Sequence, residues 1–194
     1  MSTPSANGPS IIILTGPPGS GKTTTGEILA SKSATKSVHM RADNFFDWVR
    51  SGFIPPDDPK SMEQNQTVLT AAAVSAIAYW RGGYEVIVDG IIGPWFLPIF
   101  HAAFMKAQAP AHYVVLRASP EVAIARAMTR NRSETEREME AIRSLHEAFG
   151  NLGPLEAHVV DTSFITADHA ARDLRNALPS GRFLLRAPQA SLQN

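Results

Sequence analysis

The sequence of 194 residues contains no cysteine. This excludes disulfide bonds, a thiolate zinc site and a cysteine nucleophile. The 6 histidines also lack metal-binding spacing, because neither H-x-x-x-H nor H-E-x-x-H occurs. No charge is in excess either, since 18 Lys+Arg face 18 Asp+Glu. A chain of zero net charge is not expected to coat nucleic acid or an anionic membrane.

Long hydrophobic segments are missing as well. The longest apolar run, residues 91–105, is interrupted by Pro94, Pro98 and His101 and is too short to span a bilayer. Residues 1–10 contain no basic side chain, so they make a poor signal peptide and we expect a flexible N-terminus. At 44% hydrophobic and 19% charged residues, the composition is that of an ordinary globular protein, which we expect to be cytoplasmic.

Short β-branched runs alternate with helical patterns along the chain. We expect strands at residues 11–15, 38–42, 84–90, 112–117 and 158–161. We expect helices at about 22–33, 61–81, 95–106, 119–130, 133–150 and 166–178, with a helical turn or two at 44–50. The segments 61–64 and 133–136 fit capping boxes. This alternation predicts an α/β fold with a parallel sheet covered on both faces. We expect a single domain at 11–180 and a tail at 181–194.

The most specific motif is GPPGSGKT at residues 16–23, which matches G-x-x-x-x-G-K-[ST] at every fixed position. Its glycines let successive backbone N–H groups form an anion nest, and the loop ends at a helix N-terminus that favours phosphate. We expect Lys22 to reach the β- and γ-phosphates of ATP, Thr23 to ligate Mg²⁺ and Thr24 to contact the α-phosphate. The expected ATP-binding residues of this segment are Gly16, Pro17, Pro18, Gly19, Ser20, Gly21, Lys22, Thr23 and Thr24.

Polar residues also stand at the end of each of the other four predicted strands. This is the sheet edge where α/β proteins bind ligands. They are Arg41, Asp43, Asp89, Arg117, Asp161 and Thr162. Asp43 has two interpretations, as the N-cap of the next helix or as the acid that orients and deprotonates a substrate hydroxyl. Asp89 ends an apolar run in the manner of a Walker-B acid, and would hold Mg²⁺ directly or through water. The alternative for Asp89 is an acid that only caps the strand exit.

Lysine is scarce, with 5 lysines against 13 arginines, and arginine suits forked phosphate contacts. Arg126, Arg130 and Arg132 lie close together with no acid between them. A helix–loop–helix that bears arginines is typical of a lid, here at about 126–137, that closes over phosphates and stabilises the transferring phosphoryl group. The alternative is a solvated helix whose arginines pair with Glu134, Glu136 and Glu138.

We expect His39, on the second strand, to be a buried structural histidine rather than a wall of an acceptor pocket. Several aromatic residues flank the second and third strands, and most of them are expected in the core, with one or two touching a substrate. They are Phe45, Phe46, Trp48, Trp95 and Phe96.

With these motifs the chain resembles the P-loop kinases of the nucleoside-monophosphate-kinase-like group. Within it, the chain is most similar to shikimate kinase, gluconate kinase, chloramphenicol phosphotransferase and the zeta-toxin type. The resemblance covers about 11–178 and rests on GPPGSGKTT, HMRADNFF, VIVDG and RAMTRNR.

This resemblance implies a three-layer P-loop NTPase fold, with a five-stranded parallel sheet in the order 2-3-1-4-5 and a mobile lid. It implies that Asp43 handles the acceptor hydroxyl and that Arg126 and Arg130 are lid arginines. It also implies that Thr162 lies in the loop that often cradles adenine. Two segments depart from the family, GFIPPDDP after the second strand and GIIGPWFLP after Asp89, so the acceptor is not implied. No N-K-x-D motif supports guanine recognition.

Three functional hypotheses follow. The first is an ATP-dependent phosphotransferase that acts on a hydroxyl of a small metabolite or antibiotic, with ATP and Mg²⁺ as cofactors. Its expected catalytic residues are Lys22, Asp43, Arg126, Arg130 and Arg132. The second is an ATP-binding regulatory or toxin-like module, which the lack of a recognised acceptor motif keeps open. The third is a polynucleotide 5′-kinase, against which the zero net charge argues. The sequence gives no oligomeric state.

Overall fold

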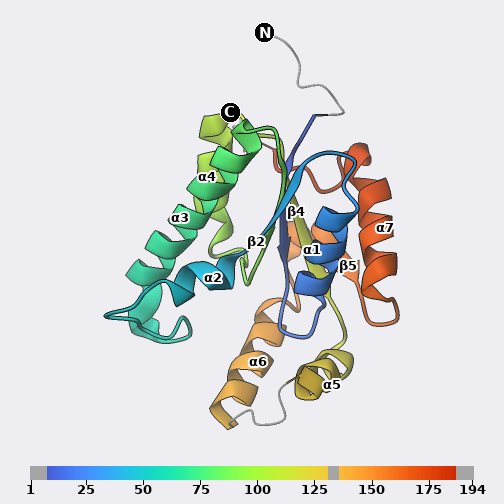
Figure 1. Cartoon of the computed structure of the whole chain (residues 1–194). Helices are drawn as coiled ribbons and strands as arrows, with labels where there is room; N and C mark the ends of the chain where they lie inside the picture. Colours follow the sequence, from blue (N-terminus) through green and yellow to red (C-terminus); the bar gives the residue numbers. More distant parts are fainter. Residues whose placement is uncertain (1–7, 131–135, 187–194) are drawn as a thin grey trace, which may run out of the picture.

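A five-stranded parallel sheet forms the centre of the molecule (Figure 1), as seen in a computed structural model that describes residues 8–130 and 136–186. The strand order is β2-β3-β1-β4-β5, which confirms the predicted α/β fold and strand order. The strands are β1 (Ile11–Thr15), β2 (Ser37–Arg41), β3 (Glu85–Asp89), β4 (Ala111–Arg117) and β5 (Val159–Asp161).

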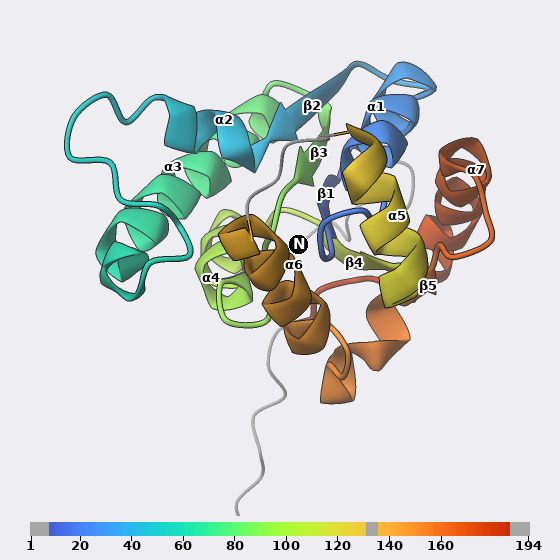
Figure 2. The same cartoon turned by 90° about the horizontal axis from the view of Figure 1, so that it is seen from below.

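Helices cover both faces of the sheet. They are α1 (Lys22–Ser31), α2 (Ala42–Asp47), α3 (Met62–Arg81), α4 (Leu97–Ala107), α5 (Pro120–Arg130), α6 (Glu136–Ala148) and α7 (Ala167–Ala177). Helices α1 and α7 pack together on one face, and α3 and α4 pack together on the other. Seen from below, α5 and α6 lie at the carboxyl end of the sheet, with α6 between α5 and the pair α2 and α3 (Figure 2).

Successive strand residues point to opposite faces and enter two separate cores. Ile11 and Ile13 of β1 pack in the core under α3 and α4, whereas Ile12 and Leu14 pack in the core under α1 and α7. All four side chains are fully buried. Burial on both faces explains why the central strand β1 is almost continuously apolar, and it leaves the carboxyl ends of the strands as the place for polar groups.

The outer edge of β4 is covered by two segments. Strand β5 spans only Val159–Asp161 and pairs with the last part of β4. Beside the first part of β4, the amide of Tyr113 donates to Phe183 and the amide of Leu185 donates to Ala111, each at 2.8 Å. The segment at residues 183–185 therefore completes the sheet edge.

The expected capping box at 61–64 is wrong. Ser61 occupies the N-cap position of α3, but its hydroxyl donates to the carbonyl of Pro56 at 2.9 Å. The Gln64 amide instead bonds both backbone groups of Ile54, at 2.8 and 2.6 Å. The loop before α3 folds back onto the first turn of this helix. Its backbone groups at Ile54 and Pro56 bond the two side chains in place of the helix N-terminus. The second expected box, at 133–136, includes residues outside the described ranges. None of the described helices has the length and hydropathy needed to cross a membrane.

Candidate active site

The phosphate-binding loop joins β1 to α1, and its glycines cannot be replaced by larger residues without strain or overlap. Gly16, Gly19 and Gly21 adopt positive φ angles of 142°, 76° and 91°. A Cβ atom on Gly19 would overlap the carbonyl of Ala123 at the start of α5, and one on Gly16 would overlap the carbonyl of Leu116. Glycine is therefore needed at both positions, for its conformation and for the close approach of the neighbouring backbone.

Carbonyl groups of this loop are bonded by side chains around it. Lys22 Nζ donates to the Pro17 carbonyl at 3.0 Å, and Thr162 Oγ1 donates to the Ser20 carbonyl at 3.0 Å. His146 Nε2, from α6, lies 3.0 Å from the Pro18 carbonyl. Because a carbonyl only accepts hydrogen bonds, Nε2 of His146 carries a proton. These contacts stabilise a loop conformation whose N–H groups are left for an anion.

Two oxygen atoms of the kind that could hold a magnesium ion lie together at the end of this loop. Thr23 Oγ1 and Asp89 Oδ1 are 3.3 Å apart, and Asp89 is only 1% exposed. Hydroxyl and carboxylate oxygens suit Mg²⁺, which usually takes one or two protein ligands together with water and substrate phosphates. Accordingly, no group of three or more His, Cys, Asp or Glu side chains within 8–130 and 136–186 forms a metal cage. Thr23 and Asp89 therefore fit the expected ion.

His39 holds the other oxygen of Asp89. Its Nε2 lies 2.6 Å from Asp89 Oδ2, and 16% of its side chain is exposed. Gly26 of α1 faces the imidazole, since a Cβ there would lie 2.8 Å from Nε2. The sequence predicted a merely structural histidine, whereas the structure brings His39 into direct contact with the expected magnesium ligand.

Asp43 lies in the first turn of α2, where it does not act as the N-cap. Arg41 occupies the N-cap position, so this alternative for Asp43 is wrong. Burial raises the pKa of the Asp43 carboxyl above its usual value, and the negative charge of Asp89 raises it further, with a smaller effect from Asp47. Lys22 and Arg41 oppose this rise in pKa. Asp43 is therefore electrostatically coupled to the phosphate-binding loop.

Asp43 also lines a cavity of about 790 Å³ beside the loop. Its walls come from α2, α3 and α6, from the loop at 51–58 and from the segment after β3. Three of the expected aromatic residues line it, namely Phe46, Trp95 and Phe96, and they are joined by Phe53. Trp48 does not line it and is 67% exposed, with its ring centroid 4.7 Å from that of Phe45. Both segments that depart from the family pattern thus contribute to this cavity.

A family model described as an AAA domain matches residues 12–146, which is more than half of the chain. The chain belongs to the AAA domain family. No curated protein matches this AAA domain by sequence.

Solved structures share the fold of this AAA domain over nearly its whole length. An APS kinase from Mycobacterium tuberculosis, in complex with AMPPNP and APS, has a TM-score of 0.69 at 14% identity, covering 88% of this chain and 98% of the other. A sugar kinase from Janibacter sp. HTCC2649 has a TM-score of 0.61 at 17% identity, with coverages of 89% and 97%. A tunicamycin resistance protein from Deinococcus radiodurans has a TM-score of 0.61 at 17% identity, with coverages of 92% and 99%. The predicted resemblance to P-loop small-molecule kinases is thereby confirmed at the level of the fold.

The arginines predicted to form a lid are only partly described. Arg126 Nη2 donates to the carbonyls of Thr162 and Ser163, at 3.0 and 3.4 Å. Arg126 and Thr162 also line a hollow of about 270 Å³ next to Gly21 and Thr24 of the loop. Thr24, Thr162 and Arg126 thus line one hollow, which shares no lining residue with the cavity beside Asp43 among the described residues. The side chain of Arg130 and all of Arg132 lie outside the described residues.

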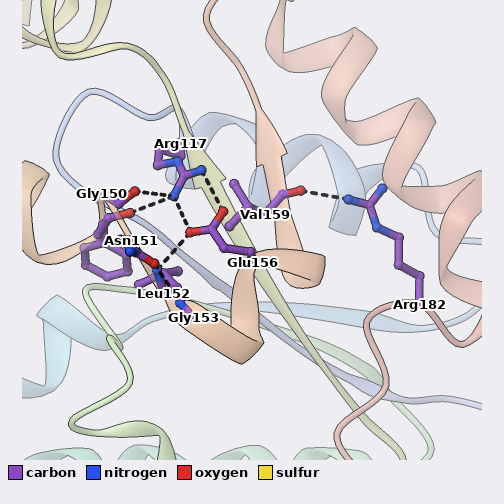
Figure 3. Close-up of polar contacts among 9 residues, drawn as sticks. Arg117, Gly150, Asn151, Leu152, Gly153, Glu156, Val159 and Arg182 are labelled. Carbon is purple, nitrogen blue, oxygen red and sulfur yellow. Dashed lines mark hydrogen bonds and ion pairs between the residues drawn. The ribbon is translucent and has the colours of Figure 1, made fainter.

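Arg117 joins the end of β4 to the segment that follows α6. Its guanidinium donates to both carboxylate oxygens of Glu156 at 2.9 Å and to the carbonyls of Phe149 and Gly150 at 3.0 and 3.1 Å (Figure 3). The hydrogen bonds from Arg117 lower the pKa of Glu156 to about 2. Asp161 is likewise used locally, because its carboxylate accepts from the amide and the hydroxyl of Ser163 at 2.8 and 2.6 Å.

Proposed function

We propose that this AAA domain is an ATP-dependent phosphotransferase that moves the γ-phosphate of ATP·Mg²⁺ to a hydroxyl group of a small molecule. One observation carries the proposal: Asp43 is coupled to Lys22 and Asp89 of the phosphate site and also lines the neighbouring cavity. A carboxylate between a nucleotide site and a second cavity is where phosphoryl transfer needs a base.

On the nucleotide side, the residues from Gly16 to Thr24 would hold the phosphates of ATP. Lys22 would leave the Pro17 carbonyl and bind the β- and γ-phosphates. Thr23 and Asp89 would hold Mg²⁺, which neutralises charge on the phosphates when bound. The hollow lined by Arg126 and Thr162 is the proposed place for the rest of the nucleotide.

On the acceptor side, Asp43 would orient the hydroxyl and take its proton as the oxygen attacks the γ-phosphorus. The new O–P bond forms while the bond from the γ-phosphorus to the β,γ-bridging oxygen breaks, and ADP leaves with that electron pair. The raised pKa of Asp43 supports this role, because a base works best when its pKa approaches the working pH. Arg126, Arg130 and Arg132 would stabilise the charge on the transferring group as the lid closes.

The test is a Lys22→Ala variant assayed for ADP release with ATP, Mg²⁺ and a library of small alcohols. We expect an acceptor found with the wild type to be phosphorylated about 10²–10³-fold more slowly by the variant, because the main positive charge on the phosphates is lost. The matched control is Lys32→Ala at the end of the same helix, where Lys32 pairs with Asp168 at 2.8 Å on the surface.

Circular dichroism should show the fold retained in both variants. Unchanged phosphorylation of a true acceptor by Lys22→Ala would contradict the proposal. Tight ATP binding by the wild type with no stimulation by any alcohol would instead favour an ATP-binding regulatory module.

A further inference from the structure

Helix α6 forms one wall of the cavity beside Asp43. Figure 2 shows this helix at the carboxyl end of the sheet, between α5 and the pair α2 and α3. The residues of α6 that line the cavity recur at the spacing of one helix face. They are Glu140, Ala141, Ser144, Leu145 and Ala148. A molecule that fills the cavity would therefore rest against α6 along most of this face.

The same helix holds the phosphate-binding loop through His146. This residue is buried, and its Nε2 donates to the Pro18 carbonyl at 3.0 Å. Burial lowers the pKa of the His146 imidazole, while the bond to Pro18 raises this pKa and the charge of Lys22 lowers it. His146 is thus close enough to Lys22 for their charges to interact, beside the expected phosphates. One helix therefore contacts both halves of the candidate site.

The carboxyl end of α6 is held in place by its neighbours. Phe149 is fully buried, and the carbonyls of Phe149 and Gly150 accept from Arg117 at 3.0 and 3.1 Å (Figure 3). The ring of Phe149 also packs edge-on against Trp95, which lines the cavity, with ring centroids 5.4 Å apart. Packed elements of this kind change between discrete arrangements and do not deform continuously. A ligand that shifts α6 is therefore expected to shift His146 with it.

We propose that His146 is a positioning residue that couples the cavity beside Asp43 to the phosphate-binding loop through α6. With its Nε2 on the Pro18 carbonyl, the loop keeps the conformation that leaves its N–H groups for phosphate. A molecule in the cavity that holds α6 in this position would raise the affinity for ATP, and ATP would raise the affinity for that molecule by the same factor. The inference rests on the proposed function only where it takes this cavity as the acceptor site.

The test measures amide hydrogen exchange by mass spectrometry, with and without saturating AMPPNP and Mg²⁺. In the wild type we expect the nucleotide to slow exchange about fivefold or more, both at residues 16–24 and at residues 139–150. His146→Met nearly keeps the volume of the side chain but has no donor, so protection should remain at 16–24 and be lost at 139–150. His146→Ala, measured in parallel, should behave in the same way. His146→Gln keeps an N–H donor near the position of Nε2 and should retain the protection at 139–150.

The control is His101→Ala on α4. His101 also contacts a backbone carbonyl through its Nε2, that of Arg186 at 2.8 Å, and its loss should leave the wild-type pattern. The coupling is overturned if the nucleotide protects only residues 16–24 in the wild type, or if His146→Met keeps the protection at 139–150. It is also overturned if His146→Gln and His146→Met behave alike, because a residue that only fills space needs no donor.

The proposed function is judged separately, from acceptor-dependent ADP release. Protection of both segments without any such ADP release would remove the phosphotransferase and leave the coupling. Acceptor-dependent ADP release with protection at 16–24 alone would keep the phosphotransferase and remove the coupling. Protection of neither segment would contradict the nucleotide site itself, and the coupling with it.

Discussion

The two halves of the candidate site lie at the same edge of the sheet but are built in different ways. The phosphate half is a continuous segment, and neighbouring backbone presses on its glycines so closely that a Cβ on Gly19 would overlap the Ala123 carbonyl. The acceptor half is assembled from segments far apart in the chain, and its loop at 51–58 is open: a Cβ on Gly52 would meet nothing within 4 Å. We therefore expect the phosphate half to tolerate few substitutions, and the proposed acceptor half to tolerate more of them without loss of the fold.

The sharpest way to separate the halves is an Asp43→Asn variant. We expect turnover to fall about 10²–10⁴-fold, because the acceptor hydroxyl loses its base. The affinity for ATP should stay within a few-fold of the wild type, as measured by calorimetry. Because the native pKa of Asp43 is raised, the wild type should lose turnover as the pH falls through that raised pKa.

The same variant has a predictable effect on stability. A raised native pKa means that the folded state binds more protons than the unfolded state in that range, so stability falls as the pH rises through it. At neutral pH the charged Asp43 is therefore a cost, and Asp43→Asn should unfold at the same or a higher temperature. A large loss of ATP affinity or of stability in this variant would contradict the assignment of Asp43 to the acceptor half alone.

Two glycine variants compare the halves directly. Gly19 and Gly52 have nearly equal φ angles, 76° and 71°, so an alanine at either position costs about 1–2 kcal/mol of backbone strain. Only Gly19→Ala also forces the loop away from Ala123. We therefore expect Gly19→Ala to weaken ATP binding about 10- to 100-fold and Gly52→Ala to leave it nearly unchanged. Equal ATP affinities in the two variants would show that the packing around the phosphate loop is unimportant.

A smaller effect is expected at the proposed metal ligand, Asp89. His39→Ala removes the partner of Asp89 Oδ2, and losing a hydrogen bond that orients a metal ligand typically weakens metal binding about 10- to 100-fold. The affinity for Mn²⁺, measured by electron paramagnetic resonance with AMPPNP present, should fall about tenfold, with partial recovery in His39→Gln. His169→Ala on α7 is the control. Wild-type Mn²⁺ affinity in His39→Ala would mean that His39 only fills space.

The smallest effect is expected at the Arg117 clamp. Glu156→Gln should lower the unfolding temperature slightly at neutral pH without changing ATP affinity, because this pair joins β4 to the segment after α6. Since the native pKa of Glu156 is depressed to about 2 from 4.5, its contribution is present above pH 4.5 and disappears as the pH falls towards 2. Thermal unfolding at several pH values checks this, with the exposed Glu147→Gln as control. A difference that persists at pH 2 would assign the effect to something other than this ion pair.

Local patterns were enough to predict the strands, a parallel sheet and the loop between a strand and a helix at residues 16–23, whereas the strand order was implied by the resemblance to P-loop kinases. The strand at 11–15, the loop and the start of α1 follow one another directly, so spacing alone determines their geometry. Contacts between distant residues could not be predicted in this way. His39 meets Asp89, and His146 meets Pro18, only because the fold brings separate elements together.

Side chains with several possible partners were also beyond prediction. Ser61 and Gln64 match a capping box, yet the loop before α3 supplies Pro56 and Ile54 as closer partners. Arg117 follows a strand just as Asp43 and Asp89 do, but Glu156 and two carbonyl groups bind it elsewhere. A short motif carries no information on such competing partners. The proposed acceptor cavity could not be predicted either, because its walls come from segments far apart in the chain.

The pairing of β4 with the segment at 183–185 has a consequence for folding during synthesis. Strand β4 lies in the interior of the sheet, but the segment at 183–185 that bonds its first part is among the last described residues. During synthesis, β4 therefore leaves the ribosome long before its outer partner and exposes unpaired backbone groups beside an apolar core. Open strand edges of this kind recruit other chains. A product truncated before Phe183 should therefore aggregate, even though it contains every proposed catalytic residue.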